Sequence, residues 1–233
     1  MGETAPTTLP PAVVTNGRVP FGVPFPESYA MRTLVVWVTS CCSGLTIYGM
    51  LVWLPTLYRT VFQLPLDSAM RYGVVSMVAA FVGALLGVFT IDRLGRKWTF
   101  GLAFLGAALP LLYLAMSVRH VGAAEVGAAE VAALTAISIA MIAIVQCGIF
   151  VYAPEMYPTR ARARATGAGA ASAVLRLSSV VGPLIIGSLL TYSSIGVVFL
   201  YLAVVALVAL VGCVVIAFFG RETKGVRLDD LAA

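Results

Sequence analysis

The chain has 233 residues, of which 61% are hydrophobic and only 11% are charged, and it has a net charge of +5. Soluble domains carry about 25% charged residues, so this composition excludes an ordinary soluble enzyme or binding module and indicates a multi-pass membrane protein. The positive net charge is explained by membrane orientation, as shown below, and does not require a nucleic-acid partner.

The amino-terminal segment contains the proline-rich stretches "TLPPAVV" and "VPFGVPFPES" but no long apolar run. A signal peptide needs a basic start followed by an apolar block, so we do not expect one here. We expect three parts: a cytoplasmic, linker-like segment over residues 1–30, a transmembrane bundle over residues 31–219, and a cytoplasmic tail over residues 220–233.

Six apolar runs follow this segment. A helix needs about 20 apolar residues to cross the hydrocarbon core of a bilayer. The runs lie at about 33–58, 70–91, 98–117, 131–153, 165–190 and 195–219. The sequence therefore predicts an all-α membrane protein with six transmembrane helices.

The basic residues are unevenly distributed between the two sides of these runs. Most of the 15 lysines and arginines lie at the amino end, between the second and third runs, between the fourth and fifth runs, or after the sixth run. The other side has only Arg59, Arg71 and Arg119. Because basic loops stay in the cytoplasm, we expect both termini to be cytoplasmic and the protein to reside in a plasma or inner membrane.

Three charged motifs lie on the expected cytoplasmic side: "DRLGRK" at 92–97, "PEMYPTRARARATG" at 154–167 and "GRETKGVRLDDL" at 220–231. Basic loops of this kind are often orientation signals alone. Here each motif also has an acidic residue at the membrane boundary. We therefore expect carboxylates to pair with arginines of other loops and to hold the cytoplasmic side closed, using bidentate geometry.

The fifth run, "ATGAGAASAVLRLSSVVGPLIIGSLL", has Arg176 near its centre. A charge at that depth costs a few kcal/mol on insertion scales. Its helical neighbours are small or weakly polar, for example Ser172 and Ser179, so we expect Arg176 to point inward, where backbones approach closely or a cavity opens. A structural partner and a charged substrate both remain possible. Since no acidic residue lies in the middle of a run, we favour an anionic substrate.

Other polar side chains inside the runs are weaker candidates for substrate binding. Thr46 and Trp53 share one face of the first helix, Tyr48 lies on the other face, and Gln146 is an amide inside the fourth run. Threonine more commonly bonds its own helix backbone, and an aromatic residue near the end of a span is often an interfacial anchor.

Catalytic and metal-binding residues are scarce. His120 is the single histidine, and the cysteines lie inside apolar runs, where they behave as small apolar residues. Hydrolytic chemistry would need paired acids, an activated nucleophile or metal ligands, and "DRLGRK" lacks the glycines of a phosphate loop. We expect neither an enzyme nor an ATP-driven pump, and no cofactor or metal.

The three motifs, in this order with two spans between each pair, resemble the carboxyl-terminal half of a major facilitator superfamily transporter. "DRLGRK" is similar to that family's D-R-x-G-R-[RK] loop, "PEMYPTRAR" to its P-E-x-[YF]-P-T-x-x-R segment, and "RETKG" to the P-E-T-K-G tail of sugar porters, with Arg221 in place of proline. The resemblance implies one half of a twelve-helix fold. It also implies a cytoplasmic gate network formed by Asp92, Arg93, Gly95, Arg96, Glu155, Arg162 and Glu222.

The Arg176 segment resembles the eleventh helix of aromatic-acid/proton symporters and organic anion transporters, and "YGMLVWLPTLY" in the first run resembles the seventh helix of the metabolite symporter branch. The resemblance implies a secondary transporter half for a small carboxylate, coupled to protons, with Arg176 at the substrate carboxylate. Gln146, Tyr48, Thr46 and Trp53 are the further substrate-binding candidates, from their positions inside the runs. Its partners would be the lipid bilayer, the substrate and a second six-helix half. The alternatives are a protein or gene fragment that transports nothing by itself, and a sugar transporter.

Overall fold

The computed structural model describes residues 27–121, 126–155 and 166–219. Over these residues it contains six helices, and each is long and apolar enough to cross a membrane. The predicted number of spans is therefore confirmed. In chain order the helices are α1 (Glu27–Thr60), α2 (Leu66–Leu94), α3 (Arg96–Val121), α4 (Ala128–Glu155), α6 (Thr166–Tyr192) and α7 (Ile195–Phe219).

Four of the helices, α1 to α4, extend at both ends beyond the apolar runs from which they were predicted, whereas α7 has the predicted bounds. α1 begins at Glu27, before the apolar run at about 33, and α2 begins at Leu66. The first turns of α2 include Asp67 and Arg71, whose side chains form an ion pair at 2.8 Å. A helix can continue past the hydrocarbon core because its charged end turns lie where water is present. The segment predicted over 1–30 lies almost entirely outside the described residues.

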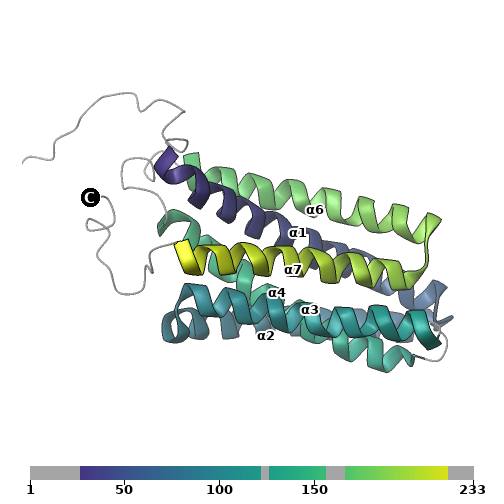
Figure 1. The fold of residues 1–233 in the computed structure, drawn as a ribbon. Helices are drawn as coiled ribbons and strands as arrows, with labels where there is room; N and C mark the ends of the chain where they lie inside the picture. The colour runs from purple at the N-terminus through teal and green to yellow at the C-terminus, as the bar shows by residue number, and fades with distance from the viewer. Residues whose placement is uncertain (1–26, 122–125, 156–165, 220–233) are drawn as a thin grey trace, which may run out of the picture.

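The six helices form one bundle in which α2 and α6 lie at opposite edges (Figure 1). The most extensive contacts join α1 with α6, α2 with α4, and α3 with α7. Within the apolar stretches of α2 and α6 only 22% of the residues are buried, against 61% in α1. The two edge helices therefore each leave a wide apolar face uncovered by the described residues.

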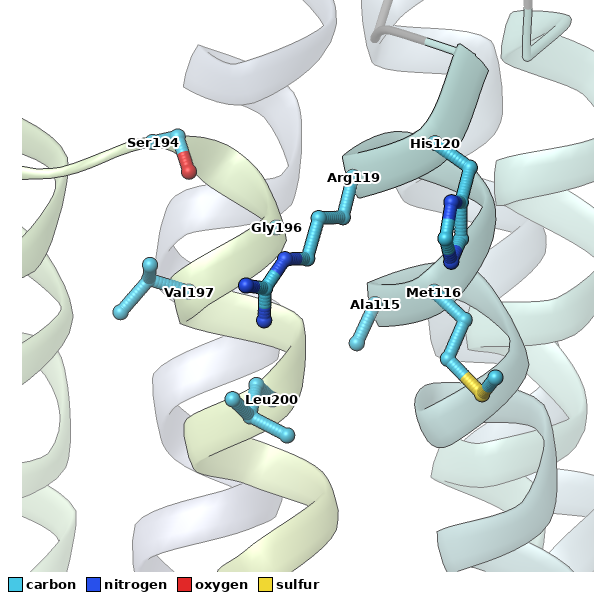
Figure 2. Close-up of a pocket in the computed structure, with 8 residues that line it drawn as sticks. All are labelled: Ala115, Met116, Arg119, His120, Ser194, Gly196, Val197 and Leu200. Atoms are coloured by element: carbon cyan, nitrogen blue, oxygen red, sulfur yellow. The ribbon is translucent and has the colours of Figure 1, made fainter.

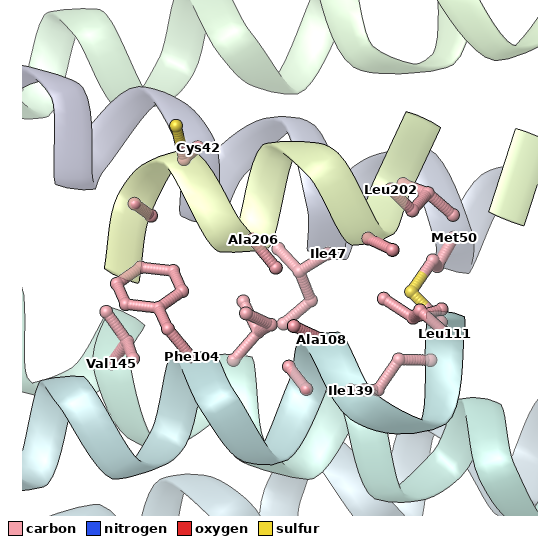
Figure 3. Packing of buried hydrophobic residues seen from close by; sticks show 14 of the residues in the cluster. Cys42, Ile47, Met50, Phe104, Ala108, Leu111, Ile139, Val145, Leu202 and Ala206 are labelled. Atoms are coloured by element: carbon pink, nitrogen blue, oxygen red, sulfur yellow. The ribbon is translucent and has the colours of Figure 1, made fainter. Parts of the chain in front are cut away.

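Large apolar side chains fill the centre of the bundle, where α1, α3, α4 and α7 meet (Figure 3). Phe104 and Leu111 of α3 and Ile139 of α4 are completely buried, and they pack with Ile47 of α1 and Leu202 of α7 in the same cluster. Truncating a side chain of this size in a packed core leaves a cavity and costs about 2–5 kcal/mol. This core fixes the positions of the helices that flank it.

α2 packs against α4 through small residues. A Cβ added to Gly83 would overlap the carbonyl oxygen of Ala140, and one added to Gly87 would lie 3.1 Å from the carbonyl oxygen of Ile144. The spacing of the two glycines is that of the G-x-x-x-G pattern, which lets membrane helices approach closely. The buried stripe of α2 consists of Ala69, Ser76, Gly83, Gly87 and Ile91.

Candidate functional site

Arg176 lies on the exposed side of α6, at the edge of the bundle. Its neighbours Leu177 and Val180 are 66% and 62% exposed. Among the residues that the structure describes, no carboxylate lies within 4.0 Å of its guanidinium. Its backbone carbonyl accepts a hydrogen bond from the Ser179 hydroxyl at 2.6 Å. The charge is therefore presented outward from this bundle, without an acidic partner in the described part of the chain.

At the level of Arg176, the face of α6 that packs most closely is not the face predicted for it, although Gly187 on that face contacts the Trp53 ring further along the helix. Ser178 and Gly182 face α1: a Cβ on Gly182 would lie 2.8 Å from the carbonyl oxygen of Leu45, and a Cβ on Gly44 would lie 2.8 Å from the Cβ of Ser178. Arg176 lies beside this seam and is exposed. Close backbone approach, one of the two settings predicted for Arg176, is therefore wrong in the described bundle.

Gln146 presents a buried polar group without a partner. Its Nε2 is buried and makes no hydrogen bond within the described residues. Thr135, on the same face of α4 about three turns away, lies with its Oγ1 3.4 Å from the hydroxyl of Tyr58 in α1. Gln146 therefore lies on the side of α4 that faces α1. A buried amide donor without a partner is costly in a membrane, which makes it a candidate ligand contact.

Arg176 and Gln146 lie at similar depths in the bundle. Arg176 is about one turn from the middle of the apolar span Gly169–Tyr192, and Gln146 is about one turn from the middle of Ala128–Pro154. Because the two helices run in opposite directions, both residues are displaced toward the same end, which is the end with the turn between α2 and α3.

The three candidates in α1 have different surroundings. The Thr46 hydroxyl is buried and donates to the Cys42 carbonyl at 2.8 Å, within its own helix. The Trp53 indole donates to the Pro183 carbonyl at 2.7 Å, and so ties α1 to α6. Tyr48 is 37% exposed, on the open side of α1. Tyr48 and Arg176 thus face outward, whereas Thr46 points into the bundle and Trp53 into the α1–α6 seam.

The predicted gate residues are described only in part. In the turn between α2 and α3, Asp92 and Arg96 form an ion pair at 3.7 Å. Gly95 adopts φ 85° and ψ 159°, a conformation open only to glycine. Arg93 is exposed at this turn. The Glu155 side chain, Arg162 and Glu222 lie outside the described residues.

A polar groove of about 510 Å³ at the other end of α1 was not predicted. Thr56, Arg59, Thr60 and Gln63 line it, together with Pro55 and Leu66. Its signal in the sequence is the helical spacing of two threonines and an arginine at the end of an apolar run. This groove lies near the α1–α2 connection, away from the end toward which Arg176 is displaced.

Comparison with known proteins gives two overlapping matches to the sequence model of the Major Facilitator Superfamily, over residues 4–169 and 75–232. Several relatives have names that state a substrate, among them the putative niacin/nicotinamide transporter NiaP of Bacillus subtilis, which is 26% identical over 204 residues, 87% of this chain and 48% of the relative. The niacin transporter NiaP of Acinetobacter baylyi is 26% identical over 220 residues, which is 94% of this chain and 47% of the relative. Organic cation/carnitine transporter 7 of Arabidopsis thaliana is 29% identical over 208 residues, 85% of this chain and 39% of the relative.

The gallate transporter of Pseudomonas putida is 29% identical over 182 residues, which is 76% of this chain and 37% of the relative. The chain spans about half the length of the curated relatives it matches, and these alignments cover most of the chain.

Proposed function

This chain belongs to the major facilitator superfamily, and we propose that it is one six-helix half of a secondary transporter for a small organic carboxylate. The family match confirms the resemblance read from the cytoplasmic motifs, and six helices fit one half of the twelve-helix fold. Such transporters bind their substrate near the middle of the membrane, between two halves, and expose the site to each side in turn.

The observation that supports a carboxylate is the position of Arg176. An arginine inside a membrane span is costly unless it faces a protein partner, water or a ligand. The described residues supply no carboxylate near it, and it lies on the open side of α6. A guanidinium can hold a substrate carboxylate by two parallel hydrogen bonds. Gln146 lies at a similar depth and has an Nε2 without a hydrogen-bond partner among the described residues. We propose that it is a second hydrogen-bond donor to the substrate.

The names of the relatives support the same substrate class. Niacin and gallate are carboxylic acids, and carnitine has a carboxylate beside a quaternary ammonium group. A carboxylate is therefore common to niacin, gallate and carnitine, whereas two of the relatives' names also state nicotinamide and organic cations. Sugar transport is the alternative suggested by the cytoplasmic motifs, and the uptake test therefore includes glucose.

A second six-helix half is part of this proposal. The aligned regions cover only 47% and 39% of two of the relatives, and α2 and α6 leave apolar faces uncovered by the described residues. The half could be a separate chain, a second copy, or a further segment of the same polypeptide. The described acids Asp67, Asp92 and Glu130 lie near helix ends, so a proton-carrying acid in the membrane would come from that other half.

Orientation gives a first prediction. If the basic loops are cytoplasmic, a reporter active only in the cytoplasm should be active when fused after residues 95, 161 and 230, and inactive after residues 120 and 193. The gate proposal depends on this orientation, because it places Asp92, Arg93, Arg96, Glu155, Arg162 and Glu222 on one side. A reporter result reversed at any of these positions would contradict the orientation.

The decisive test of function is uptake into cells or proteoliposomes. It is measured with this chain alone and with this chain together with the amino-terminal six-helix half of a transporter of the same family. The labelled compounds are nicotinate, gallate, carnitine, glucose and nicotinamide. Nicotinate and nicotinamide form a matched pair, since they share the ring and differ in the carboxylate. We expect uptake of one or more carboxylates, with nicotinamide and glucose at background.

Equal uptake of nicotinate and nicotinamide would contradict a carboxylate-specific site. Uptake of glucose alone would support the sugar transporter. Background uptake of every compound in both assemblies, from protein shown to be folded in the membrane, would support a protein that does not transport.

A further inference from the structure

Two grooves lie at opposite ends of the seam between α3 and α7. The first has a volume of about 400 Å³ and lies where α3 ends and α7 begins. Arg119, His120 and Ser194 supply its polar groups, and its apolar walls include Met116, Val197 and Leu200. In Figure 2 the guanidinium of Arg119 extends from α3 into the space in front of α7. Among the described residues, Arg119 has no carboxylate within 4.0 Å.

The second groove, of about 430 Å³, lies at the start of α3 and the end of the described part of α7. Lys97 and Trp98 lie at its polar edge, and Leu102, Leu105, Leu210 and Val214 form its apolar wall. Each groove therefore combines a basic side chain near a helix end with an apolar surface that continues toward the middle of the membrane.

The exposed surface between the two grooves is apolar along both helices. On α3 the exposed side chains between Trp98 and Arg119 are Leu102, Leu105, Leu109, Tyr113 and Met116. On α7 they are Val197, Leu200, Val204, Val208, Val211 and Val214. Their spacing of three or four residues places each set on one face of its helix. A ligand in either groove can therefore continue along an apolar track.

The separation of the grooves matches the thickness of a membrane. Arg119 and Lys97 are about 33 Å apart along α3, at 1.5 Å per residue, and the hydrocarbon core of a bilayer is about 30 Å thick. Each basic residue thus lies at the level of the lipid headgroups, with the apolar track at the level of the acyl chains. The ligand that fits this pattern has an anionic head and a long apolar tail.

We propose that the α3–α7 seam binds one phospholipid at each membrane surface, with the phosphate of one lipid at Arg119 and the phosphate of the other at Lys97. At the first site the guanidinium donates charge-assisted hydrogen bonds to the phosphate oxygens, and the Ser194 hydroxyl lies in the same groove. The acyl chains lie along Met116, Val197 and Leu200. These sites are separate from Arg176, which lies on α6.

The test uses the full 233-residue chain in detergent and measures bound phosphatidylglycerol by native mass spectrometry during a lipid titration. We expect two lipids to remain bound to the unaltered chain. Arg119→Gln should weaken the binding of one of them about tenfold, because a hydrogen-bonded charge pair is lost. Arg71→Gln is the matched control, since Arg71 lies toward the same end but pairs with Asp67 at 2.8 Å.

A second variant does not remove any charge. Val197→Trp fills the first groove from its open side, at a position that is 38% exposed, and it should displace the same lipid while Arg119 remains. Lipid retention that is unchanged in both Arg119→Gln and Val197→Trp would overturn the proposal. If glycerol 1-phosphate displaces the lipid as effectively as added phosphatidylglycerol does, the groove is a site for free anions instead. If the Val197→Cys variant forms a disulfide with a second copy or with another half, the seam is a protein–protein interface and the lipid proposal is wrong.

Discussion

Replacing Arg176 with alanine is expected to abolish uptake of organic carboxylates, whereas Arg176→Lys should keep part of it. Removing one partner of a desolvated, hydrogen-bonded charge pair costs about 2–5 kcal/mol, which corresponds to a loss of roughly 30-fold to several thousand-fold in affinity. Lysine keeps the charge but loses the planar fork that holds a carboxylate by two hydrogen bonds. The measurement is the concentration dependence of uptake, in whichever assembly of this chain transports.

The stability of the ligand-free protein distinguishes whether Arg176 binds substrate or stabilises the fold. Arg176 is exposed and has no acidic partner in the described residues, so Arg176→Ala should leave the thermal midpoint level or raise it. Arg71→Ala serves as a control for the loss of an exposed charge, because its ion pair with Asp67 is highly exposed and contributes little. If Arg176→Ala unfolds the protein while Arg176→Lys transports normally, the arginine is structural and the carboxylate proposal loses its main support.

Hydropathy was sufficient to predict the number of helices but not the ends of most of them. The six runs were recognisable because about 20 apolar residues are needed to cross a bilayer. α1 begins at Glu27 and ends at Thr60, and α2 includes both Asp67 and Asp92. Charged end turns do not register as apolar, although their backbone remains helical. Four of the six predicted spans were therefore shorter than their helices at both ends, whereas the span at 195–219 coincides with α7.

Which face of α6 packs against its neighbour could not be read from the sequence. Small residues occur on several faces of this helix, so Ser172 and Ser179 suggested one packed face while Ser178 and Gly182 form the actual one. Lipid is also as apolar as a protein core, so an exposed Val180 and a buried Ile186 look alike in sequence. The exposure of Arg176 follows from the three-dimensional packing of α6 on α1.

A signal for close packing was nevertheless present in α2. The stretch "GALLG" from Gly83 to Gly87 has the spacing that brings membrane helices together, and both glycines face α4 in the structure. Sequence reasoning that considers only hydropathy and charge passes over such a pair, because glycine contributes to neither.

The same contact gives the second large effect. Gly83→Leu is expected to prevent stable packing of α2 on α4, and Gly83→Ala to destabilise the bundle by about 1–3 kcal/mol, the usual cost of overpacking. Even a single Cβ at this position overlaps the Ala140 carbonyl oxygen. Backbone atoms cannot rotate away as a flexible side chain can, so the two helices must separate. The measurement is the thermal unfolding midpoint of the purified chain in detergent.

Gly101→Ala is the matched control, because a Cβ added there would meet nothing within 4 Å. Both substitutions replace a glycine inside a helix with alanine, which by itself favours the helix by about 0.5–1 kcal/mol. The two variants should therefore shift the unfolding midpoint in opposite directions, with Gly101→Ala level or higher and Gly83→Ala lower. If both raise the midpoint equally, α2 does not approach α4 as closely as the structure shows. The G-x-x-x-G contact would then contribute nothing to holding α2 at the edge of the bundle.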